Sequence, residues 1–325
     1  MKSLPLQALL AAAALLSPLA MAQTPAFPTK TVKIIVPFAP GGGNDAFARQ
    51  IAHALTDVWK QPVIVENRPG AGGNIGTAFA ASAPADGYTL LLGHTGTLSI
   101  NPGLYGSKLP YKPQSDFIPV SLVASTPLLL VVNPAVNMSK LSEIIARAKA
   151  SPTELNYASS GSGTGSHLSG ELLKRMAGVQ ITHISYKGTA PAVTDVLGGQ
   201  VQMMFGVVPT VLPHIKAGKL TAIAVTGKTR LPSLPNVPTL TEAGLPGYES
   251  TLAYGILAPK GTPDAIVKEI HTQISKALTT PKMMALLAAE GATPLQGDSA
   301  EYAALIKAET EKWGKVIKDG NIQVD

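Results

Sequence analysis

Short apolar runs alternate along the chain with segments whose apolar residues recur at helical spacing. The runs "TVKIIVPF", "PVIVENRP" and "YTLLLGH" are typical of buried strands, and "DAFARQIAHALTDVW" is typical of a helix that packs on one face. The alternation continues through "LNYASS", "QITHISY", "VQMMFGV" and "LTAIAVTG", and the C-terminal segments are helical. Short apolar strands separated by helices predict an α/β fold with mainly parallel sheets covered on both faces.

One uncharged stretch, Phe117 to Met138, is long enough to cross a membrane as a helix. Pro119, Pro127 and Pro134 interrupt it, and Ser, Thr and Asn residues lie within it. It is better interpreted as two buried strands, "FIPVSLVA" and "PLLLVVN". We therefore expect no transmembrane helix in this stretch.

The first 22 residues have the pattern of a secretory signal peptide. Lys2 supplies the positive end, "LQALLAAAALLSPLA" the apolar core, and Ala20–Ala22 an A-x-A cleavage site. We expect export across a bacterial inner membrane, cleavage after Ala22 and a periplasmic location. The chain has no cysteine, which excludes disulfides, thiolate nucleophiles and Cys-ligated metal sites.

The chain has 325 residues, so the part after the signal peptide suffices for two domains of about 150 residues each. The net charge of +6 is dispersed, with no run of five basic residues, which indicates solubility rather than a nucleic-acid surface. Aromatic residues make up only 5%, so stacking platforms for bases or sugars are scarce.

Four times along the chain, a strand ends in glycines or small polar residues and a helix begins. These loops are Gly41–Asn44, Gly70–Gly76, Ser159–Ser166 and the weaker case Tyr186–Pro191. Ligands of open α/β sheets bind at the carboxyl ends of strands, where helix N-termini offer free N–H groups and a partial positive charge. Two such loops in each half predict two lobes that face each other across a cleft. The ligand is expected to be an anion: a phosphate, a sulfate or a carboxylate.

None of the four loops contains an arginine, since Arg49 lies one turn into its helix and Arg68 precedes Pro69. A strong phosphate site or a bidentate carboxylate clamp usually recruits arginine. We therefore expect recognition by backbone N–H groups and hydroxyls, with waters bridging the gaps. This favours a small carboxylate over a phosphate.

Several polar residues at these loops have a structural interpretation beside the functional one. Asn44 is placed to cap the first helix, and Thr189 to cap the helix that Ala190 and Pro191 open. Asp45 is interpreted as mainly structural, bonding amides of the neighbouring "GAGGN" loop.

Other polar groups at the loops remain open between two roles. Thr164 and Ser166 can cap a helix or donate hydroxyls to a ligand. Asp195 is either a solvated helix residue or a partner for an ammonium or hydroxyl group. For His94 and His167, packing or capping is favoured over contact with a ligand.

Motifs of enzymes and nucleotide-binding proteins are incomplete in this sequence. "GSGTGS" has Ser166 where a dinucleotide loop needs its third glycine, and "GKT" has Ala222 where a P-loop needs its first. G-x-S-x-G is absent, and the six histidines show no H-x-x-x-H spacing. We expect a protein that is not an enzyme and that has no metal, no cofactor and no nucleic-acid partner.

The chain contains, in this order, "VPFAPGGGNDAFAR", "VENRPGAGGNIGT", "ADGYTLLLGH", "YASSGSGTGSHLSGELL", "ISYKGTAPAVTDVLGGQVQMMF" and "LPNVPTLTEAGLPGYE". These segments resemble the extracytoplasmic solute receptors of tripartite tricarboxylate transporters, the Bug family of periplasmic substrate-binding proteins. The resemblance runs from about Phe27 to the C-terminus. It implies a two-lobed periplasmic-binding-protein fold, type II-like, that closes on one small mono- or dicarboxylate in the cleft between lobes. It further implies a monomer that docks on the integral-membrane permease subunits of the transporter.

The same fold also serves periplasmic sensing modules that pass ligand occupancy to a signalling partner, and this alternative stays open. An exported hydrolase is the less supported third possibility. The loop pattern and the resemblance together place the first lobe at residues 23–123 and 245–325, and the second at residues 124–244. The two chain crossings that form the hinge are expected around Ala124 and around residues 245–255.

The resemblance implies which residues contact the ligand. The first lobe would hold a carboxylate through its two glycine loops, and the second lobe would supply a helix start and one further helix. Asn44 departs from the threonine or serine common in the family after the glycines. The implied ligand-binding residues are Phe38, Ala39, Gly43, Asn44, Ala71, Gly73, Asn74, Ser159, Ser160, Gly163, Thr164, His167, Thr189, Ala190 and Asp195.

Overall fold

The computed structural model describes residues 27–41, 43–152 and 154–323. The predicted signal peptide lies outside these residues and stays a prediction. Within them, no helix is long and apolar enough to cross a membrane. The uncharged stretch after residue 116 forms a strand, so the rejection of a transmembrane helix there is confirmed.

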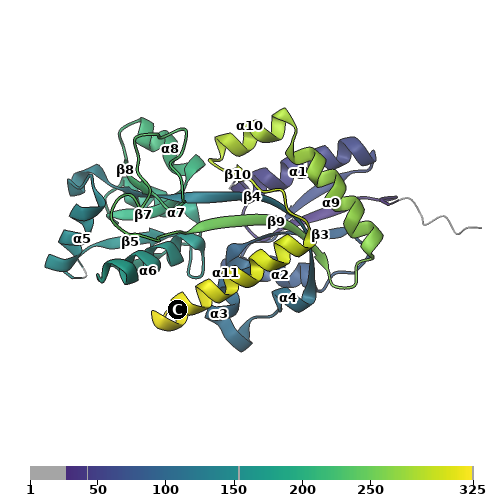
Figure 1. Cartoon of the computed structure of the whole chain (residues 1–325), viewed down its shortest axis with the longest axis horizontal. Helices are drawn as coiled ribbons and strands as arrows, with labels where there is room; N and C mark the ends of the chain where they lie inside the picture. Colours follow the sequence, from purple (N-terminus) through teal and green to yellow (C-terminus); the bar gives the residue numbers. More distant parts are fainter. Residues whose placement is uncertain (1–26, 42, 153, 324–325) are drawn as a thin grey trace, which may run out of the picture.

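The strands join into one sheet in the order β2-β1-β3-β9-β4-β7-β5-β6, with β8 and β10 paired to β4. In Figure 1, the long strands β4 and β9 run from one half of the molecule into the other. The strands are β1 Val32–Val36, β2 Val63–Asn67, β3 Thr89–His94, β4 Phe117–Val132, β5 Asn156–Ser159, β6 Thr182–Ser185, β7 Met203–Val207, β8 Thr221–Val225, β9 Thr251–Pro259 and β10 Thr293–Pro294.

The sheet is mixed, whereas the sequence predicted mainly parallel pairing. β1 is parallel to β2 and β3, and β5 is parallel to β6 and β7. The prediction is wrong for the middle of the sheet. There β4 is antiparallel to β7, β8, β9 and β10, and β9 is antiparallel to β3. Parallel pairs need helical crossovers, which each half contains, whereas β4 and β9 belong to the segments that pass between halves. The α/β class and the two-lobed fold are confirmed.

β4 is one strand of 16 residues, where two strands were predicted. Its first part, Phe117–Pro127, pairs with β9, and its second part, Leu128–Val132, pairs with β7 and β8. Pro127 has no N–H to give to a ladder, and it lies where the partner strand changes. β4 therefore changes its partner strand at Pro127–Leu128, close to the first chain crossing predicted around Ala124.

Thr226 forms hydrogen bonds to both of the segments in which the two chain crossings are predicted. Its Oγ1 accepts the backbone N–H of Leu128 at 2.7 Å and donates to the carbonyl of Ser250 at 2.6 Å. Ser250 immediately precedes β9, within the region 245–255 where the second crossing is predicted. Thr226 is fully buried, so no water competes for either bond.

The helices cover both faces of the sheet in each half. In Figure 1, α5, α6, α7 and α8 gather around β5, β7 and β8, and α1, α2, α9, α10 and α11 gather around the other half. The helices are α1 Gly43–Trp59, α2 Asn74–Ala81, α3 Asn101–Tyr105, α4 Pro113–Asp116, α5 Leu141–Ala150, α6 Gly165–Ala177, α7 Thr189–Leu197, α8 Val208–Lys216, α9 Asp264–Leu278, α10 Pro281–Ala289 and α11 Ser299–Asp319, with short turns η3 Ala71–Gly73, η4 Gly96–Ile100, η5 Gly106–Lys108 and η6 Pro134–Val136.

The apolar spacing of α1 shows how the helices are held. Phe47, Ile51 and Leu55 recur every four residues, are fully buried, and share one core with Ile34 of β1. Each such side chain stabilises the fold by about 1.5–3 kcal/mol through removal from water. This packing fixes the start of α1 at the carboxyl end of β1, where a ligand is expected.

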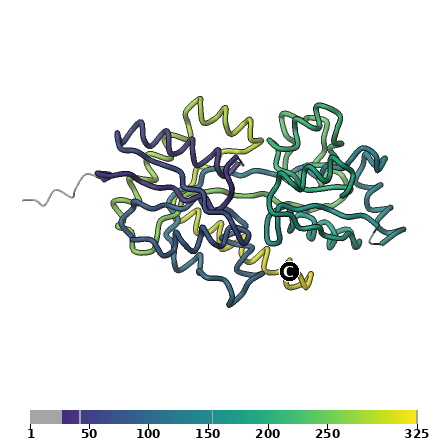
Figure 2. The backbone as a smooth tube through the Cα atoms, turned by 180° about the vertical axis from the view of Figure 1, so that it is seen from behind, coloured from purple at the N-terminus to yellow at the C-terminus, as the bar shows by residue number. Residues whose placement is uncertain are grey.

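The C-terminal helix connects the two halves on one side. Figure 2, seen from behind, shows α11 in yellow ending beside the half that contains α6. Arg175 of α6 donates to Asp319 of α11 at 2.7 Å. Both side chains are more than a third exposed, so this ion pair contributes at most about 1 kcal/mol.

Candidate functional site

The loop after β1 rests on a buried ring. Phe38 stacks on His94 at the end of β3, with ring centroids 4.7 Å apart and planes 27° apart. The Nδ1 of His94 accepts the backbone N–H of Gly96 at 2.6 Å. Burial lowers the pKa of His94 to about 4, so the ring is neutral at pH 7. His94 thus has the packing and capping role that the sequence favoured.

The start of α1 differs from the prediction in its cap. The helix begins at Gly43, so Asn44 lies in the first turn rather than at the capping position before it. Its Oδ1 is buried and has no hydrogen-bond partner among the described residues. Ala39 is exposed in the loop before the helix.

Asp45 is structural, as predicted, but its partners are not those predicted. Instead of the "GAGGN" amides, it accepts the N–H of Gly41 at 3.1 Å, Nε of Arg49 at 2.9 Å and Nδ2 of Asn67 at 3.0 Å. Burial alone would raise the pKa of Asp45, but hydrogen bonds from Arg49, Gly41 and Asn67 outweigh it and lower the pKa. The carboxylate is thereby occupied beside the helix start.

The second glycine loop packs tightly against Phe38, in the segment that follows β1. Ala71 and Gly73 have φ of +47° and +94°, which favours glycine. A Cβ on Gly73 would lie 2.7 Å from Thr97 and 2.9 Å from Phe38, so a side chain there would displace one of these neighbours. The ring of Phe38 therefore packs directly on the second glycine loop.

Asn74 anchors this loop through its side chain. Its buried Oδ1 accepts Nδ2 of Asn101 at 2.6 Å and the hydroxyl of Tyr111 at 2.9 Å. Burial raises the pKa of Tyr111, so the hydroxyl remains a donor. The carboxamide oxygen of Asn74 is thus occupied within the protein.

Three backbone N–H groups in the loop after β5 donate hydrogen bonds to side chains within the loop or at the start of α6. Gly161 donates to Oγ of Ser159 at 3.2 Å, and Ser160 donates to Oγ of Ser166 at 3.0 Å. Gly163 donates to Nδ1 of His167 at 3.1 Å. These three amides shape the loop, so they are not free donors for a ligand.

Thr164 takes the capping position of α6 without capping it. Its Oγ1 donates to the carbonyl of Gly161 at 2.6 Å and lies 3.0 Å from Oγ of Ser166. The Thr164 hydroxyl therefore bonds to the loop carbonyl and not to the first N–H groups of α6. The first amides of α6 are consequently left without a Thr164 cap.

His167 is buried and stacks on His183, with centroids 4.0 Å apart. Burial, then the neighbouring His183 and Lys174, lower the pKa of His167 to about 3. The neutral ring accepts the Gly163 N–H, so its role in this structure is to hold the loop. His183 also hydrogen-bonds with Oγ of Ser159 at 2.6 Å.

The fourth loop begins α7 one residue earlier than predicted. Gly188 takes the capping position, and Thr189 is the first helical residue without a side-chain cap bond. Ala190 is exposed. Asp195 accepts the hydroxyl of Tyr186 at 2.6 Å, and burial together with Asp195 raises the pKa of Tyr186 to about 12. Asp195 therefore has a partner inside its own half.

The glycine loops of the two halves meet. A Cβ on Gly72 would lie 3.3 Å from the carbonyl oxygen of Ser162. A Cβ on Gly163 would lie 2.8 Å from Oδ1 of Asn101, which is buried and unpaired among the described residues. The sequence did not indicate a role for Asn101, the first residue of α3, because no local pattern identifies an asparagine whose side chain contacts a loop far away in the chain.

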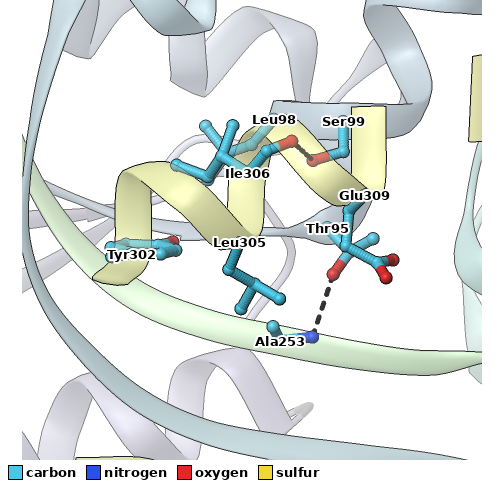
Figure 3. A pocket seen from close by; sticks show the side chains of 8 residues that line it. All are labelled: Thr95, Leu98, Ser99, Ala253, Tyr302, Leu305, Ile306 and Glu309. Carbon is cyan, nitrogen blue, oxygen red and sulfur yellow. Dashed lines mark hydrogen bonds between the residues drawn. The ribbon is translucent and has the colours of Figure 1, made fainter. Parts of the chain in front are cut away.

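Two hollows lie away from these loops. Figure 3 shows the smaller one, which is lined by Thr95 and Ser99 and by Tyr302, Leu305 and Ile306 of α11. It has room for about one water molecule. The larger, of about 450 Å³, is lined by residues of η4, α3, η5 and α4, by the segment between η5 and α4, and by Thr310 of α11. Neither is lined by a predicted ligand-binding residue. No group of three His, Asp or Glu side chains in the described ranges could hold a metal ion.

Comparison with known proteins identifies the family. Residues 47–322 match the model of the tripartite tricarboxylate transporter family receptor. Protein BugT of Bordetella pertussis is 40% identical over 294 residues, which cover 90% of each chain. The chain therefore belongs to this family of solute-binding receptors.

Two similar solved structures contain ligands. R. palustris Rpa4515 with adipate is 37% identical, with a TM-score of 0.86 over 92% of this chain and 100% of that chain. MatC from Rhodopseudomonas palustris with bound malate is 35% identical, with a TM-score of 0.83 over 90% of this chain and 100% of that chain. Both ligands are small dicarboxylates.

Proposed function

We propose that this protein is a periplasmic receptor that captures one small mono- or dicarboxylate between its two lobes and delivers it to a membrane permease of the tripartite tricarboxylate type. The observation that carries the proposal is the close approach of the two halves at their loops. Gly72 lies against the carbonyl oxygen of Ser162, and Gly163 lies against the side chain of Asn101. Helix starts lie beside both loops, and helix starts favour anions.

The nearby arginines support recognition by backbone groups. Arg49 is paired with Asp45, and Arg68 is paired with Glu66 and lies over the ring of Phe79. A ligand at the loops would therefore meet N–H groups and hydroxyls before guanidinium groups. Such a site suits a carboxylate better than a phosphate. Relatives with bound adipate and malate agree with this class of ligand.

Lobe closure explains how the receptor would signal occupancy. A ligand that touches both halves favours the closed form, because only that form offers both sets of contacts. The crossings at Pro127–Leu128 and Ser250–Thr251 are where such a motion would occur. The closed receptor would then present a surface formed by both lobes to the permease.

The proposal is tested with the double variant Gly43→Val, Thr164→Ala, titrated with adipate and malate by calorimetry. We expect binding by the wild type and none by the variant. Far-ultraviolet circular dichroism and the melting temperature establish that the variant folds. Wild-type affinity in the folded variant would contradict the assignment of these loops as the ligand site.

A further inference from the structure

Glu290 has a carboxylate that the proposed function leaves unexplained. It directly follows α10, and its side chain is half-buried. No hydrogen bond or ion pair joins this carboxylate to another residue in the described part of the chain. A carboxylate partly removed from water without a partner costs free energy. Consistent with this, burial raises the pKa of Glu290.

Glu290 lies beside the start of α1. A Cβ on Gly43 would be 3.1 Å from Oε2 of Glu290. Its charge also reaches the buried hydroxyl of Tyr254, whose pKa burial and Glu290 raise to about 12. The carboxylate is thus next to a loop that the proposed site uses.

Glu290 also lies close to the other half. Figure 1 shows the end of α10 turned toward α8. The next residue, Gly291, packs so closely on Val208 that a Cβ there would lie 2.8 Å from that side chain. Glu290 is therefore near the meeting of the two halves, at the starts of α1 and α8.

A second acceptor beside Gly43 also lacks a donor. Asn44 follows Gly43 in the chain, and its Oδ1 is buried and unpaired within the described residues. Ionised Glu290 has only acceptor oxygens. A ligand that satisfies both groups must bring hydrogen-bond donors, which a fully ionised plain dicarboxylate does not have.

We propose that Glu290 selects ligands that carry a hydroxyl or ammonium donor in addition to a carboxylate. The inference rests on the proposed function, because it assumes that the ligand lies at the start of α1. An ionised carboxylate accepts such a donor and repels a second bare carboxylate. Hydroxy- or amino-dicarboxylates are therefore expected to bind more tightly than a plain dicarboxylate of the same length.

Calorimetric titration of the mature chain with succinate, malate and aspartate tests this selection. The three probes share a four-carbon dicarboxylate skeleton and differ in one hydrogen, hydroxyl or ammonium group. We expect malate or aspartate to bind at least about tenfold more tightly than succinate, the typical effect of a hydrogen bond to a charged group. The tighter of the two identifies the donor as a hydroxyl or an ammonium group.

The variant Glu290→Gln isolates the contribution of the carboxylate. It is expected to lose the preference by at least about tenfold while keeping or improving its affinity for succinate. Glu311→Gln removes the same charge from the exposed face of α11 and serves as the control with unchanged ratios.

Three results separate this inference from the receptor function. If the ratios of the affinities for malate, aspartate and succinate are unchanged in Glu290→Gln, the role of Glu290 is overturned and the proposed receptor function stands. Binding of succinate or adipate alone, with no binding of malate or aspartate, also overturns that role. If the wild type binds none of succinate, malate, aspartate and adipate, this inference is overturned, and the proposed function is contradicted only if no other mono- or dicarboxylate binds either.

Discussion

Gly163 donates its backbone N–H to Nδ1 of the buried His167 over 3.1 Å. This bond requires an unprotonated nitrogen, so one loop of the candidate site depends on a neutral imidazole. The two residues are four positions apart, at the end of the loop and in the first turn of α6. Protonation of His167 at low pH should therefore lower the free energy of unfolding and break the hydrogen bond that holds this loop.

Stability should fall as the pH drops below about 6.5. Unfolded imidazoles bind a proton near pH 6.5, whereas the folded chain resists protonation of His94 down to about 4 and of His167 down to about 3. Between these values the unfolded state binds more protons, so the free energy of unfolding decreases toward acid. Each imidazole contributes at most about 1.4 kcal/mol per pH unit. Chemical denaturation at a series of pH values measures the slope.

The variants His167→Asn and His167→Leu separate charge from hydrogen bonding. Both remove one titrating group, so both should flatten the slope below pH 6.5. Only Asn keeps an acceptor for the Gly163 N–H, so Leu alone should also lose ligand affinity. A slope that stays the same in both variants contradicts the buried, neutral His167.

Gly163→Ala should weaken ligand binding by at least about tenfold, because the new Cβ would meet Oδ1 of Asn101 at 2.8 Å and hold the halves apart. The left-handed backbone, with φ of +80°, adds a destabilisation of about 1–2 kcal/mol. Calorimetry gives the affinity, and small-angle X-ray scattering with ligand gives the degree of closure.

Gly178→Ala is the matched control for this strain. Gly178 ends α6 with φ of +63°, and a Cβ there meets nothing within 4 Å. It should lose stability and keep the wild-type affinity. Equal affinity losses in both variants would show that strain, and not the contact with Asn101, weakens binding.

Thr226→Val should destabilise the fold by about 2–4 kcal/mol. Valine keeps the shape of threonine but leaves the Leu128 N–H unpaired and removes the bond to the Ser250 carbonyl. Thr262→Val, which loses one buried bond to Pro259, should cost only about 1 kcal/mol. Urea denaturation of the two variants measures the difference, and similar values for both would count against Thr226 as the tie between the crossings.

Much of the fold was predictable because its signals are local. The apolar run at Val32–Val36 and the helical spacing of Phe47, Ile51 and Leu55 each report burial of their own segment. The single strand β4 was not, because Pro127 has the local appearance of a strand end. Antiparallel pairing of β4 with β9 joins residues more than a hundred positions apart, which no local pattern encodes.

The sequence predicted where the loops of the candidate site lie, but not which of their N–H groups are free to donate a hydrogen bond. Glycines after strands located the loops, because chain geometry requires them there. Which N–H groups are free depends on tertiary partners such as His167 for Gly163. Asn101 reaches Asn74 across 27 positions, and Glu290 comes beside Gly43 only in the folded chain. The assignment of individual ligand contacts stays a prediction.

The first measurement to make is a thermal-shift panel of small mono- and dicarboxylates on the purified chain from residue 23 onward. A ligand at a hundred times its dissociation constant adds about 2.7 kcal/mol to the free energy of unfolding, which gives a clear rise in melting temperature. If the protein is a receptor for small carboxylates, at least one carboxylate in the panel produces this rise. Stabilisation by phosphates, sugars or nucleotides, with none by any carboxylate, would contradict the proposed receptor function.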